Sequence, residues 1–449
     1  MSKVSFESFA NVIDGKLRYG TATAHAIDPS TGKNNWGIPV ATAQDLEDAV
    51  TSAKKAYVLW SAKPWSERAV AVGRLGQVLV DYREEMLLLL MKEAGKPRLA
   101  AEVELDFARD FFHFYAGQQP LGDEVVQDDN ELRLTQYHVP LGVVGAIVPF
   151  NFPLALAAGK IAAALLIGNT IIVKPSRTTP YSILKLADIA RQFLPPGVFQ
   201  ALSGESSIGP LITKHPGIAK IAFTGSTEAG KKIMLAASET LKAITLELGG
   251  NSPSIICPDV DISKIVVEVA KGAFFNSGQF CLASKRIFVH ESIYKEFLDA
   301  FTALLRTWKA GPAFASDTVL GPVQNKMQYD VPTVIDNPPD SALIVTEEPF
   351  GPIVPIQSWK TEDEVIARVN NTLLGLGGTV WSADIKRAER LAQSIESGTI
   401  WINSSEVPLP QEYMSGWKES GVGGEWGRKG LFSYCQVKTV HHYKTNVGK

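Results

Sequence analysis

Short apolar runs alternate with amphipathic segments along most of the chain. Residues 43–60 and 67–90 carry apolar side chains at steps of three and four residues, which predicts two amphipathic helices on the outside of a first domain. From Gly142 onward, short apolar runs are separated by helix-like segments. The runs that predict strands are 143–150, 171–176, 198–204, 220–226 and 243–250. Because strands separated by helices need crossover connections, this pattern predicts a parallel sheet.

A second alternating series follows the glycine pair Gly249 and Gly250. Its predicted strands are 253–257, 285–290, 377–382 and 399–404. One predicted helix ends at 275, and three others cover 294–308, 362–370 and 385–397. The two series predict an α/β chain with two parallel-sheet domains, hinged at the glycine pair. Parallel sheets bind ligands at the carboxyl ends of their strands, and domain junctions commonly hold clefts, so we expect a site where the domains meet.

Composition and charge narrow the class of protein. The 449 residues are enough for two or three domains of roughly 100–200 residues each. A net charge of −3 gives no electrostatic basis for binding nucleic acid or an anionic membrane. Three widely spaced cysteines, and seven histidines without ligand spacing, favour neither a disulfide framework nor a metal site. We therefore expect a globular protein without a metal.

Neither the N-terminus nor the longest apolar run has the pattern of a segment that enters a membrane. Residues 1–18 contain no apolar core of a signal peptide. The longest apolar run, 154–167, is interrupted by Gly159 and Lys160 and is too short to span a bilayer. We expect a cytoplasmic protein, in a reducing compartment that keeps its thiols free.

Small and polar residues precede Cys281, whereas a structural cysteine usually has bulky apolar neighbours. Asn276, Ser277, Gly278 and Gln279 lie just after a helix that is predicted to end near 275. This places the thiol on a loop at the end of a helix, where a small molecule can reach it. Taken alone, a lone cysteine is more often a buried structural thiol, so both interpretations stay open at this point.

A carboxylate interrupts an apolar strand upstream of this cysteine. Glu247 stands between Leu246 and Leu248, in a run that ends in the glycine pair. A buried carboxylate is costly unless it is paired or has a function. Burial would also raise its pKa toward the range that suits a general base. A glutamate that forms a salt bridge in the strand is the alternative.

The order and spacing of residues 246–250 (LELGG) and 275–281 (FNSGQFC) resemble the two active-site signatures of the NAD(P)-dependent aldehyde dehydrogenase superfamily. Similar motifs extend from 28–32 (DPSTG) to 437–440 (VKTV), so the resemblance covers nearly the whole chain. It implies an aldehyde-dehydrogenase-like α/β fold, with two parallel-sheet, Rossmann-like domains and a small β oligomerisation element. The implied division is 1–120 and 140–248 for the dinucleotide-binding domain, 249–415 for the catalytic domain, and 121–139 with 416–449 for the oligomerisation element.

The resemblance also implies a reaction, the oxidation of an aldehyde to a carboxylic acid with NAD(P)+. Cys281 would add to the carbonyl as the nucleophile, giving a thiohemiacetal, and loss of hydride would leave a thioester. The Asn151 side chain and the Cys281 backbone N–H would bind the oxyanion, although an Asx-turn before Pro153 also explains an asparagine here. Glu247 would activate the water that releases the acid. Lys160 matches a lysine that the family keeps near this network, and a solvated helix lysine is the alternative.

The signals for NAD or NADP are individually weaker. Gly225 and Ser226 follow a predicted strand and open a helix, an arrangement that suits a phosphate but also an ordinary tight turn. In the family, the counterpart of Lys174 contacts the adenosine ribose, and those of Glu348 and Phe350 hold the nicotinamide ribose and pack near the ring. The cofactor-binding residues that the resemblance implies are Pro149, Phe150, Lys174, Arg177, Gly209, Gly225, Ser226, Leu248, Glu348 and Phe350.

Arg177 departs from the pattern of relatives that prefer NAD. These often carry a glutamate three places after the lysine, which binds both ribose hydroxyls and repels a 2′-phosphate. Here an arginine stands beside Lys174, and a pair of cations attracts a phosphate dianion. The sequence therefore suggests that NADP is accepted, with a solvent-facing arginine as the alternative.

A second departure lies near residue 330. Family members carry a long helix, a turn and a strand between the segments that resemble 321–330 and 331–339, whereas here Asp330 runs directly into Val331. A block of the catalytic domain is therefore expected to be absent, together with a lysine that contacts the cofactor ribose in many relatives. Such a loss would expose apolar surface and loosen the second domain. The sequence leaves open whether neighbouring segments close the gap or activity is impaired.

The tail of the chain has glycine-rich turns followed by an alternating, strand-like stretch. In the family this tail pairs across subunits with a hairpin that resembles Glu131–His138, and those residues alternate as well. The resemblance thus implies a homodimer or homotetramer.

Two other functions and the choice of substrate remain open. An acylating dehydrogenase would pass the thioester to coenzyme A or phosphate, but Glu247 would then be unnecessary. An inactive relative with a structural or binding role is consistent with the missing block, and the intact catalytic residues argue against it. Four phenylalanines near the reacting groups predict an apolar mouth for medium-chain or aromatic aldehydes, unless they only fill the core: Phe152, Phe274, Phe275 and Phe280.

Overall fold

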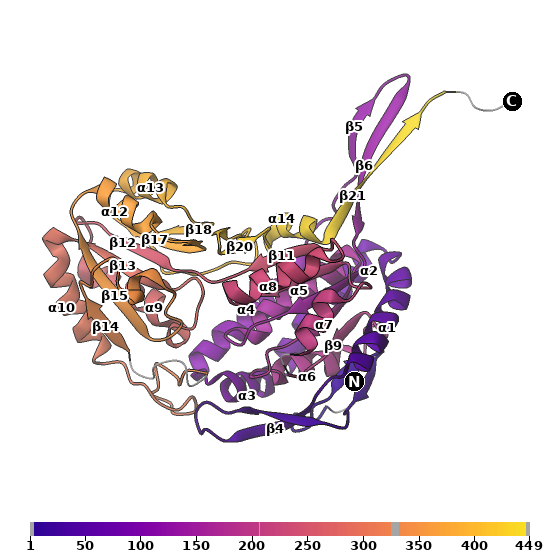
Figure 1. Ribbon diagram of the computed structural model, residues 1–449, viewed down its shortest axis with the longest axis horizontal. Coiled ribbons are helices and arrows are strands. Elements are labelled where there is room, and N and C mark those ends of the chain that lie inside the picture. Colours follow the sequence, from indigo (N-terminus) through magenta and orange to yellow (C-terminus); the bar gives the residue numbers. More distant parts are fainter. Residues whose placement is uncertain (1–3, 206, 325–331, 446–449) are drawn as a thin grey trace.

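Eight strands form the larger sheet of the computed structural model, which describes residues 4–205, 207–324 and 332–445 (Figure 1). In spatial order they are β2 (Lys16–Arg18), β1 (Asn11–Ile13), β9 (Phe199–Ala201), β8 (Thr170–Lys174), β7 (Val143–Ile147), β10 (Lys220–Thr224), β11 (Ala243–Glu247) and β20 (Gly421–Val422). The five strands from β9 to β11 run parallel, and the outer strands pair antiparallel. The first predicted series thus forms one parallel sheet, as expected.

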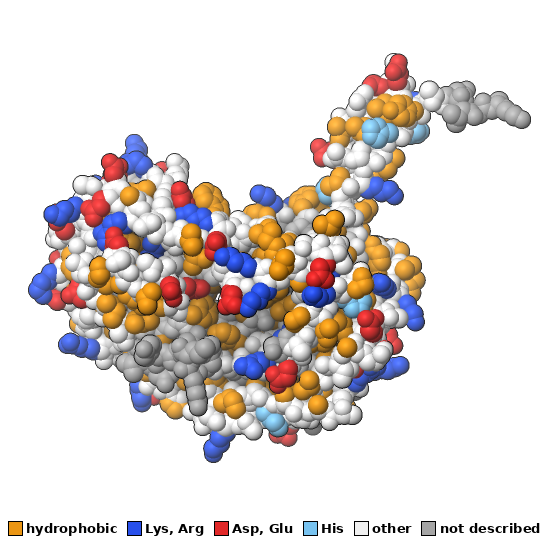
Figure 2. Space-filling view, viewed as in Figure 1, with side chains coloured by type: hydrophobic (Ala, Val, Ile, Leu, Met, Phe, Trp, Pro, Cys, Tyr) orange, Lys and Arg blue, Asp and Glu red, His pale blue; other side chains and the backbone are white. Residues whose placement is uncertain are grey.

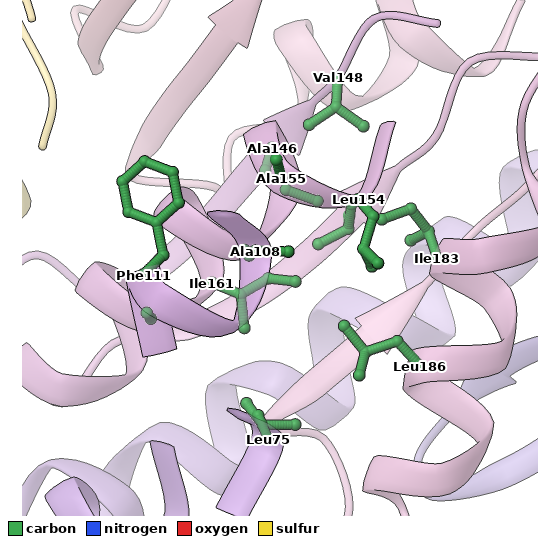
Figure 3. Packing of buried hydrophobic residues seen from close by; sticks show 14 of the residues in the cluster. Leu75, Ala108, Phe111, Ala146, Val148, Leu154, Ala155, Ile161, Ile183 and Leu186 are labelled. Atoms are coloured by element: carbon green, nitrogen blue, oxygen red, sulfur yellow. The ribbon is translucent and has the colours of Figure 1, made fainter. Parts of the chain in front are cut away.

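Helices cover both faces of this sheet, because successive side chains of a buried strand point to opposite faces. Val144 and Ile171 face one core with α2, α3, α4, α5 and α6, while Val143 and Ile172 face another with α1, α7 and α8. Figure 3 shows the first core, where Leu154 of α5 lies among side chains of the neighbouring helices. The helices are α1 (Ala43–Ser61), α2 (Trp65–Asp81), α3 (Arg83–Ala94), α4 (Arg98–Ala116), α5 (Pro153–Ile167), α6 (Tyr181–Ala190), α7 (Ile208–Lys214) and α8 (Thr227–Ser238).

The single helix predicted over 67–90 is wrong, because the structure has two helices there. Tyr82, with φ −115° and ψ 33°, separates α2 from α3. The break lets α3 bury an almost continuous apolar run, including Met86 and Leu90, on more than one side. Neither glycine nor proline stands near Tyr82, and the weaker helix formers Val80 and Asp81 are too common within helices to mark the break. Packing between the two helices and the core decides it.

The second predicted series forms a six-stranded sheet in which every neighbouring pair is parallel. Its order is β14 (Thr333–Asp336), β15 (Ile353–Trp359), β13 (Ser284–His290), β12 (Ser252–Ile256), β17 (Gly377–Trp381) and β18 (Thr399–Ile402). Two helices cover each face: α9 (Ile262–Phe274) and α10 (Tyr294–Leu305) on one, α12 (Glu362–Asn370) and α13 (Ile385–Ser394) on the other. The predicted α/β fold with two parallel, Rossmann-like sheets is confirmed.

A three-stranded antiparallel sheet projects from the body of the molecule (Figure 1). It consists of β5 (Glu124–Asp128), β6 (Leu132–Pro140) and β21 (Cys435–Tyr443). The remaining elements are β3 (Thr23–Ile27) paired with β4 (Asn34–Pro39), β16 (Leu374–Gly375) paired with β19 (Trp417–Lys418), α11 (Leu343–Thr346), α14 (Gly427–Leu431), and short 3₁₀ turns at Phe275–Gly278, Glu291–Ile293 and Phe432–Tyr434.

The C-terminal part of the expected oligomerisation element, residues 416–449, is split in the structure between the body and the projecting sheet. Residues 416–434 lie on the body: β20 joins the eight-stranded sheet, and Leu431 and Tyr434 belong to its large core. Only β21 enters the projecting sheet, and it pairs with β6 of its own chain from Cys435 opposite Pro140 to Tyr443 opposite Leu132. The pairing that the resemblance placed between subunits is therefore made here within one chain.

Two predictions from sequence concern a missing block near residue 330 and the absence of a membrane-spanning segment. The block expected to be missing between Asp330 and Val331 falls outside the described residues. Directly after that gap, β14 forms the edge of the six-stranded sheet beside β15. Across the described parts of the chain, no helix has both the length and the apolar character needed to cross a bilayer.

Candidate active site

A strained turn carries the candidate nucleophile. Helix α9 ends at Phe274, and the next residues include Asn276, Ser277 and Gly278 with φ of 53°, 56° and 70°. Left-handed conformations at non-glycine residues cost roughly 1–3 kcal/mol each and persist only when the surroundings hold them. A side chain at Gly278 would place its Cβ 2.1 Å from the carbonyl oxygen of Gly351, so glycine is required. The turn delivers Cys281 to the edge of a cavity.

That cavity has a volume of about 1290 Å³ and brings together the two reacting groups predicted from sequence, Cys281 and Glu247. Much of its wall is apolar, and part of the wall is aromatic. The ring of Phe152 lies 5.3 Å from that of Phe280 and 6.1 Å from that of Phe275, measured between centroids. These three predicted phenylalanines therefore meet at the site. Phe274 also borders the cavity, but it packs on Phe301 and Trp308 in the core of the second sheet.

Figure 2 shows the exterior of the molecule, where charged and apolar side chains are interspersed and no single sign of charge dominates the visible face. This distribution agrees with the small net charge of −3. The charges that matter for the candidate site are therefore the few that are buried around it.

Glu247 ends strand β11 as a buried acid, and neither of its oxygens has a hydrogen-bond partner among the described residues. Burial raises its pKa well above the usual value, the nearby Glu425 carboxylate raises it further, and Lys160 opposes the rise. Lys160 is itself 1% exposed and forms an ion pair with Glu425 at 2.5 Å. The solvated alternative for Lys160 is therefore wrong, and Glu247 has no salt bridge of its own in the described structure.

Asn151 lies just after β7 and connects the two domains. Its side-chain N–H donates to the carbonyl of Gln279 at 3.1 Å, and its own carbonyl accepts from the Asn276 side chain at 3.1 Å. An Asx-turn would use the side-chain oxygen of Asn151, and in the described structure that oxygen accepts no hydrogen bond from the residues that follow it, so the Asx-turn is not formed. An amide NH₂ has two donors, so one N–H remains for an oxyanion near Cys281.

The thiol of Cys281 is partly buried and surrounded by acids. Burial raises its pKa to about 12, with further contributions from the charges of Glu348 and Glu247. The backbone N–H groups of Cys281 and Leu282 face the sulfur and oppose this rise. These N–H groups are also donors at the position where an oxyanion would form on a carbonyl carbon bound to the sulfur.

Sequence reasoning missed Lys285, which lies in this neighbourhood. Its side chain is 1% exposed and donates to the carbonyl of Gly278, and its nitrogen lies 5.7 Å from the ring centroid of Phe350. Burial lowers its pKa to about 8, against the charges of Glu348, Cys281 and a further acid. Lys285 and Arg286 stand together at the start of a predicted strand that continues as an apolar run, and two cations there were the signal that could have indicated it.

Sequence reasoning also missed Glu406, the further acid beside Lys285. Glu406 is buried, borders the cavity, and accepts a hydrogen bond from the Ser284 hydroxyl. Its pKa is raised to about 7 by burial. It lies in an irregular segment after β18, and nothing in its local sequence marks it.

The glycine pair is needed where the two domains touch. The Gly250 N–H donates to a carboxylate oxygen of Glu348 at 3.2 Å. A Cβ on Gly249 would lie 2.4 Å from the other oxygen of Glu348, and a Cβ on Gly250 would lie 2.2 Å from the carbonyl oxygen of Cys281. Burial raises the pKa of Glu348 to about 7, and Lys285 opposes the rise. The glycines thus allow close approach of a cofactor candidate and of the nucleophile's backbone.

Most cofactor candidates lie outside the cavity, and of this set only Leu248 borders it. Phe150, which with Pro149 follows β7, contacts Phe350 of the second domain at 5.9 Å between ring centroids. Phe350 in turn lies near Lys285, close to Glu348. These aromatic and acidic candidates therefore come from both domains and meet beside Cys281.

The remaining cofactor candidates lie at the carboxyl ends of neighbouring parallel strands. Lys174 ends β8, is buried, and has a pKa lowered to about 8 by burial and by the nearby charge of Arg177. Arg177 faces solvent and lies 3.8 Å from a carboxylate oxygen of Glu205. Ser226 caps the N-terminus of α8, where its side chain accepts from the Ala229 N–H at 3.3 Å.

Two glycines of this region have different surroundings. A Cβ on Gly225 would lie 2.5 Å from the ring of Phe223, so the protein itself requires glycine there. Among the described residues, no atom lies within 4 Å of a Cβ position on Gly209, so no described side chain covers it. An exposed helix N-terminus, an open glycine face and a buried lysine fit the phosphates and ribose of a dinucleotide.

Comparison with known proteins gives consistent similarities. A model of the aldehyde dehydrogenase family matches residues 18–331 and 329–440, in two segments that meet near residue 330. Aldehyde dehydrogenase LUC3 from a Fusarium species is 36% identical over 473 residues, which cover 98% of this chain and 100% of that protein.

Solved structures are also similar over nearly the whole length. The NAD+ complex of an aldehyde dehydrogenase from Bacillus cereus has a TM-score of 0.96 and 31% identity, covering 98% of this chain and 97% of its own. An E. coli NADP-dependent enzyme has a TM-score of 0.94 and 27% identity, covering 98% of each chain.

Proposed function

The chain belongs to the aldehyde dehydrogenase family, and from this premise we propose that it oxidises an aldehyde to a carboxylic acid with NAD or NADP through a thioester on Cys281. The observation that carries the proposal is the meeting of the Cys281 thiol and the unpartnered Glu247 carboxyl at one cavity of about 1290 Å³. A thiol and a carboxyl at one apolar cavity suit nucleophilic addition followed by hydrolysis.

The fit of a dinucleotide rests on residues at the carboxyl edge of the larger sheet. Lys174 and the N-terminus of α8 at Ser226 would hold the adenosine ribose and the phosphates, and Glu348 would hold the nicotinamide ribose. When bound, the nicotinamide accepts a hydride from the substrate carbon. Phe150 and Phe350, which contact each other, would keep water from the place where that transfer occurs.

The first half-reaction uses the Cys281 sulfur and two sets of fixed donors. The thiol gives up its proton to water, and the sulfur forms a bond to the carbonyl carbon while the carbonyl electron pair moves to oxygen. The Cys281 backbone N–H and the second N–H of the Asn151 amide would stabilise that oxygen. Collapse of the oxyanion expels hydride and leaves the thioester.

The second half-reaction uses Glu247 as a general base. A carboxylate here takes a proton from water, the water oxygen bonds to the thioester carbon, and the sulfur leaves as thiolate or thiol. The raised pKa of Glu247 makes it a stronger base than an exposed carboxylate. In the Lys160–Glu425 ion pair, Lys160 would favour the charged form of Glu247, while Glu425 disfavours it and helps to keep its pKa raised.

The two alternative functions have less support. An acylating dehydrogenase does not need a buried base at the thioester, and Glu247 borders the same cavity as Cys281. An inactive relative would not be expected to keep Cys281, Glu247 and Asn151 around one site. That the family match is split near residue 330 supports the absence of a block there, and we propose that activity persists without it.

The proposal is tested by following nicotinamide reduction with a panel of aldehydes. We expect butanal, hexanal and benzaldehyde to be oxidised, because the cavity wall is largely apolar and carries Phe152, Phe275 and Phe280. Succinic semialdehyde, matched to butanal in carbon number, should have a kcat/KM at least about tenfold lower, since its carboxylate would be desolvated near Glu247 and Glu406. Preferred turnover of the semialdehyde would contradict this substrate class, and no turnover of any aldehyde would contradict the activity.

We further propose that NADP is accepted as well as NAD, because Arg177 lies near enough to Lys174 to lower its pKa, and two neighbouring cations attract a 2′-phosphate. The change Arg177→Glu is expected to lower kcat/KM for NADP+ by about 10- to 100-fold and to change that for NAD+ little. Glu205→Gln is the matched change, since it removes the carboxylate beside Arg177 and should favour NADP+. A wild-type chain that reduces only NAD+, with an Arg177→Glu variant that reduces it equally well, would refute the role of Arg177.

The oligomeric state and the cellular location of the chain are also proposals. The three-stranded sheet projects from the body (Figure 1) and carries exposed apolar side chains such as Val125, Val437 and Tyr443. We propose that it joins subunits in a homodimer or homotetramer. The three cysteines are free thiols, and a cytoplasmic location would keep the proposed nucleophile reduced.

A further inference from the structure

Lys285 is a buried cation beside the nucleophile that the proposed reaction has not used. It lies in strand β13, four positions after Cys281, and only 1% of its surface is exposed. In the described structure it forms no ion pair with a carboxylate, and its ammonium group donates to the backbone carbonyl of Gly278. Burying an ammonium without a paired anion is costly, which indicates a function for the charge at this place.

Lys285 anchors the strained turn that precedes the nucleophile. Three consecutive residues, 276–278, are left-handed, and each is held by a contact from another part of the chain. The Asn276 side chain donates to the Asn151 carbonyl at 3.1 Å, and the Ser277 hydroxyl donates to the Gly321 carbonyl at 2.7 Å. Lys285 supplies the third contact, at Gly278, which is nearest in sequence to Cys281. Without it, the last residue of the turn loses its anchor.

Lys285 also carries a positive charge near the Cys281 sulfur, where the other charged groups named here are carboxylates. Glu247 on β11 and Glu348 after α11 both disfavour the thiolate. A charged Cys281 stabilises the Lys285 ammonium, as Glu348 and Glu406 also do. Because an interaction between two charges is reciprocal, the ammonium stabilises the thiolate by the same amount.

We propose that Lys285 is a positioning residue for the nucleophile: its ammonium holds the Gly278 end of the strained turn and supplies the positive charge against which the Cys281 thiolate forms. The inference rests on the proposed function only in that Cys281 is the reacting thiol. Lys285 touches neither substrate nor cofactor in this account, and it acts through the turn and through the charge on sulfur.

The test measures how fast iodoacetamide alkylates Cys281 as a function of pH, without cofactor or aldehyde, with the Cys281 peptide quantified by mass spectrometry. The Lys285 ammonium is charged only below its pKa of about 8, whereas the pKa of Cys281 is about 12. In Lys285→Met we therefore expect the alkylation rate to fall about tenfold below pH 8 and to approach that of the wild type above it. Lys285→Arg keeps the charge and should restore most of the rate. An unchanged profile in folded Lys285→Met would overturn the proposal.

A second buried lysine provides the control. Lys185 on α6 is also 1% exposed and donates to the carbonyls of Ser5 and Ser8, remote from the sulfur. Lys185→Met should lower thermal stability and leave the alkylation profile of Cys281 as in the wild type. An equal fall in rate in both variants would show a general effect of losing a buried lysine and would overturn the specific role of Lys285.

The outcome is independent of turnover, so failure of this proposal and failure of the proposed function are distinguishable. A chain that oxidises no aldehyde can still show the fall in alkylation rate on replacing Lys285, and an active chain can lack it. Should Lys285→Met not fold, Lys285→Gln keeps a donor for the Gly278 carbonyl but no charge. An alkylation profile of Lys285→Gln equal to that of the wild type would then overturn the electrostatic role.

Discussion

Replacing Cys281 by alanine is expected to abolish aldehyde-dependent nicotinamide reduction, with kcat/KM falling by at least about 10⁴-fold. Without the sulfur, no covalent adduct forms and no tetrahedral carbon is available to give up hydride. The fold should persist, because the side chain is only partly buried at the edge of a cavity. Steady-state absorbance of the reduced cofactor measures the loss, and thermal unfolding checks the fold.

Another cysteine offers a matched control for this experiment. Cys435 is partly buried at the start of β21, and its thiol donates to the Leu431 carbonyl at 3.6 Å, away from the cavity. Cys435→Ser should keep activity within about twofold, as surface-proximal changes usually do. A Cys281→Ala chain that still turns over aldehyde, with the same rate as Cys435→Ser, would show that the sulfur is not the nucleophile.

Replacing Glu247 by glutamine is expected to separate the two half-reactions. One equivalent of reduced cofactor should form rapidly, and the steady-state rate should then be lower than that of the wild type by about 10²- to 10⁴-fold, because the thioester is not hydrolysed. The first phase should not slow, since the charge of Glu247 disfavours the thiolate of Cys281. Rapid-mixing absorbance measures both phases, and hydroxylamine, which cleaves thioesters, should restore turnover.

The pH dependence of the same reaction follows from the raised pKa of Glu247. Burial raises the pKa of Glu247, and the acid acts as a base only in its deprotonated form, so the hydrolysis rate should rise with pH through that raised pKa. In Glu247→Gln that rise should disappear. Glu406→Gln is the matched control, since Glu406 is another buried acid of this cavity with a pKa raised to about 7.

Two results would count against Glu247 as the base. A Glu247→Gln chain without the initial burst would place this residue before hydride transfer. A Glu406→Gln chain that loses steady-state turnover as severely, while keeping its burst, would assign hydrolysis to the other acid. Glu406 already accepts a hydrogen bond from Ser284, which is why we expect its neutral replacement to be tolerated within a few-fold.

Much of the fold follows from local pattern. The alternation of apolar runs and helices predicts both parallel sheets, because each buried strand and each amphipathic helix shows its period within a few residues. The predicted helix over 362–370 coincides with α12, and the strand over 285–290 lacks only Ser284 of β13. The division of 67–90 at Tyr82 was missed, since the break arises from packing and not from a residue that stops helices.

The candidate reacting residues were also predicted from sequence, since the motifs around Cys281 and Glu247 are contiguous. Glu247 ends β11, in agreement with the rule that parallel sheets bind ligands at the carboxyl ends of their strands, whereas Cys281 precedes β13 on the turn after α9. The sequence did not indicate the buried charged groups that surround these two residues. Lys285 and Glu406 contact the site through side chains whose partners lie on other segments, and Lys160 had an equally good interpretation in solvent until its partner Glu425 was placed.

By itself, the sequence determined the two α/β units and indicated the candidate thiol, acid and amide, because each pattern depends on neighbours within a few positions. Only the tertiary structure decided that Lys160 is paired inside the protein, that Asn151 bonds to Gln279 across the domain junction, and that the tail strand β21 joins its own hairpin. The physical reason is distance along the chain. Lys160 and Glu425 are separated by 265 positions, and Asn151 and Gln279 by 128. Burial and charge at such contacts are set by which segments fold against each other.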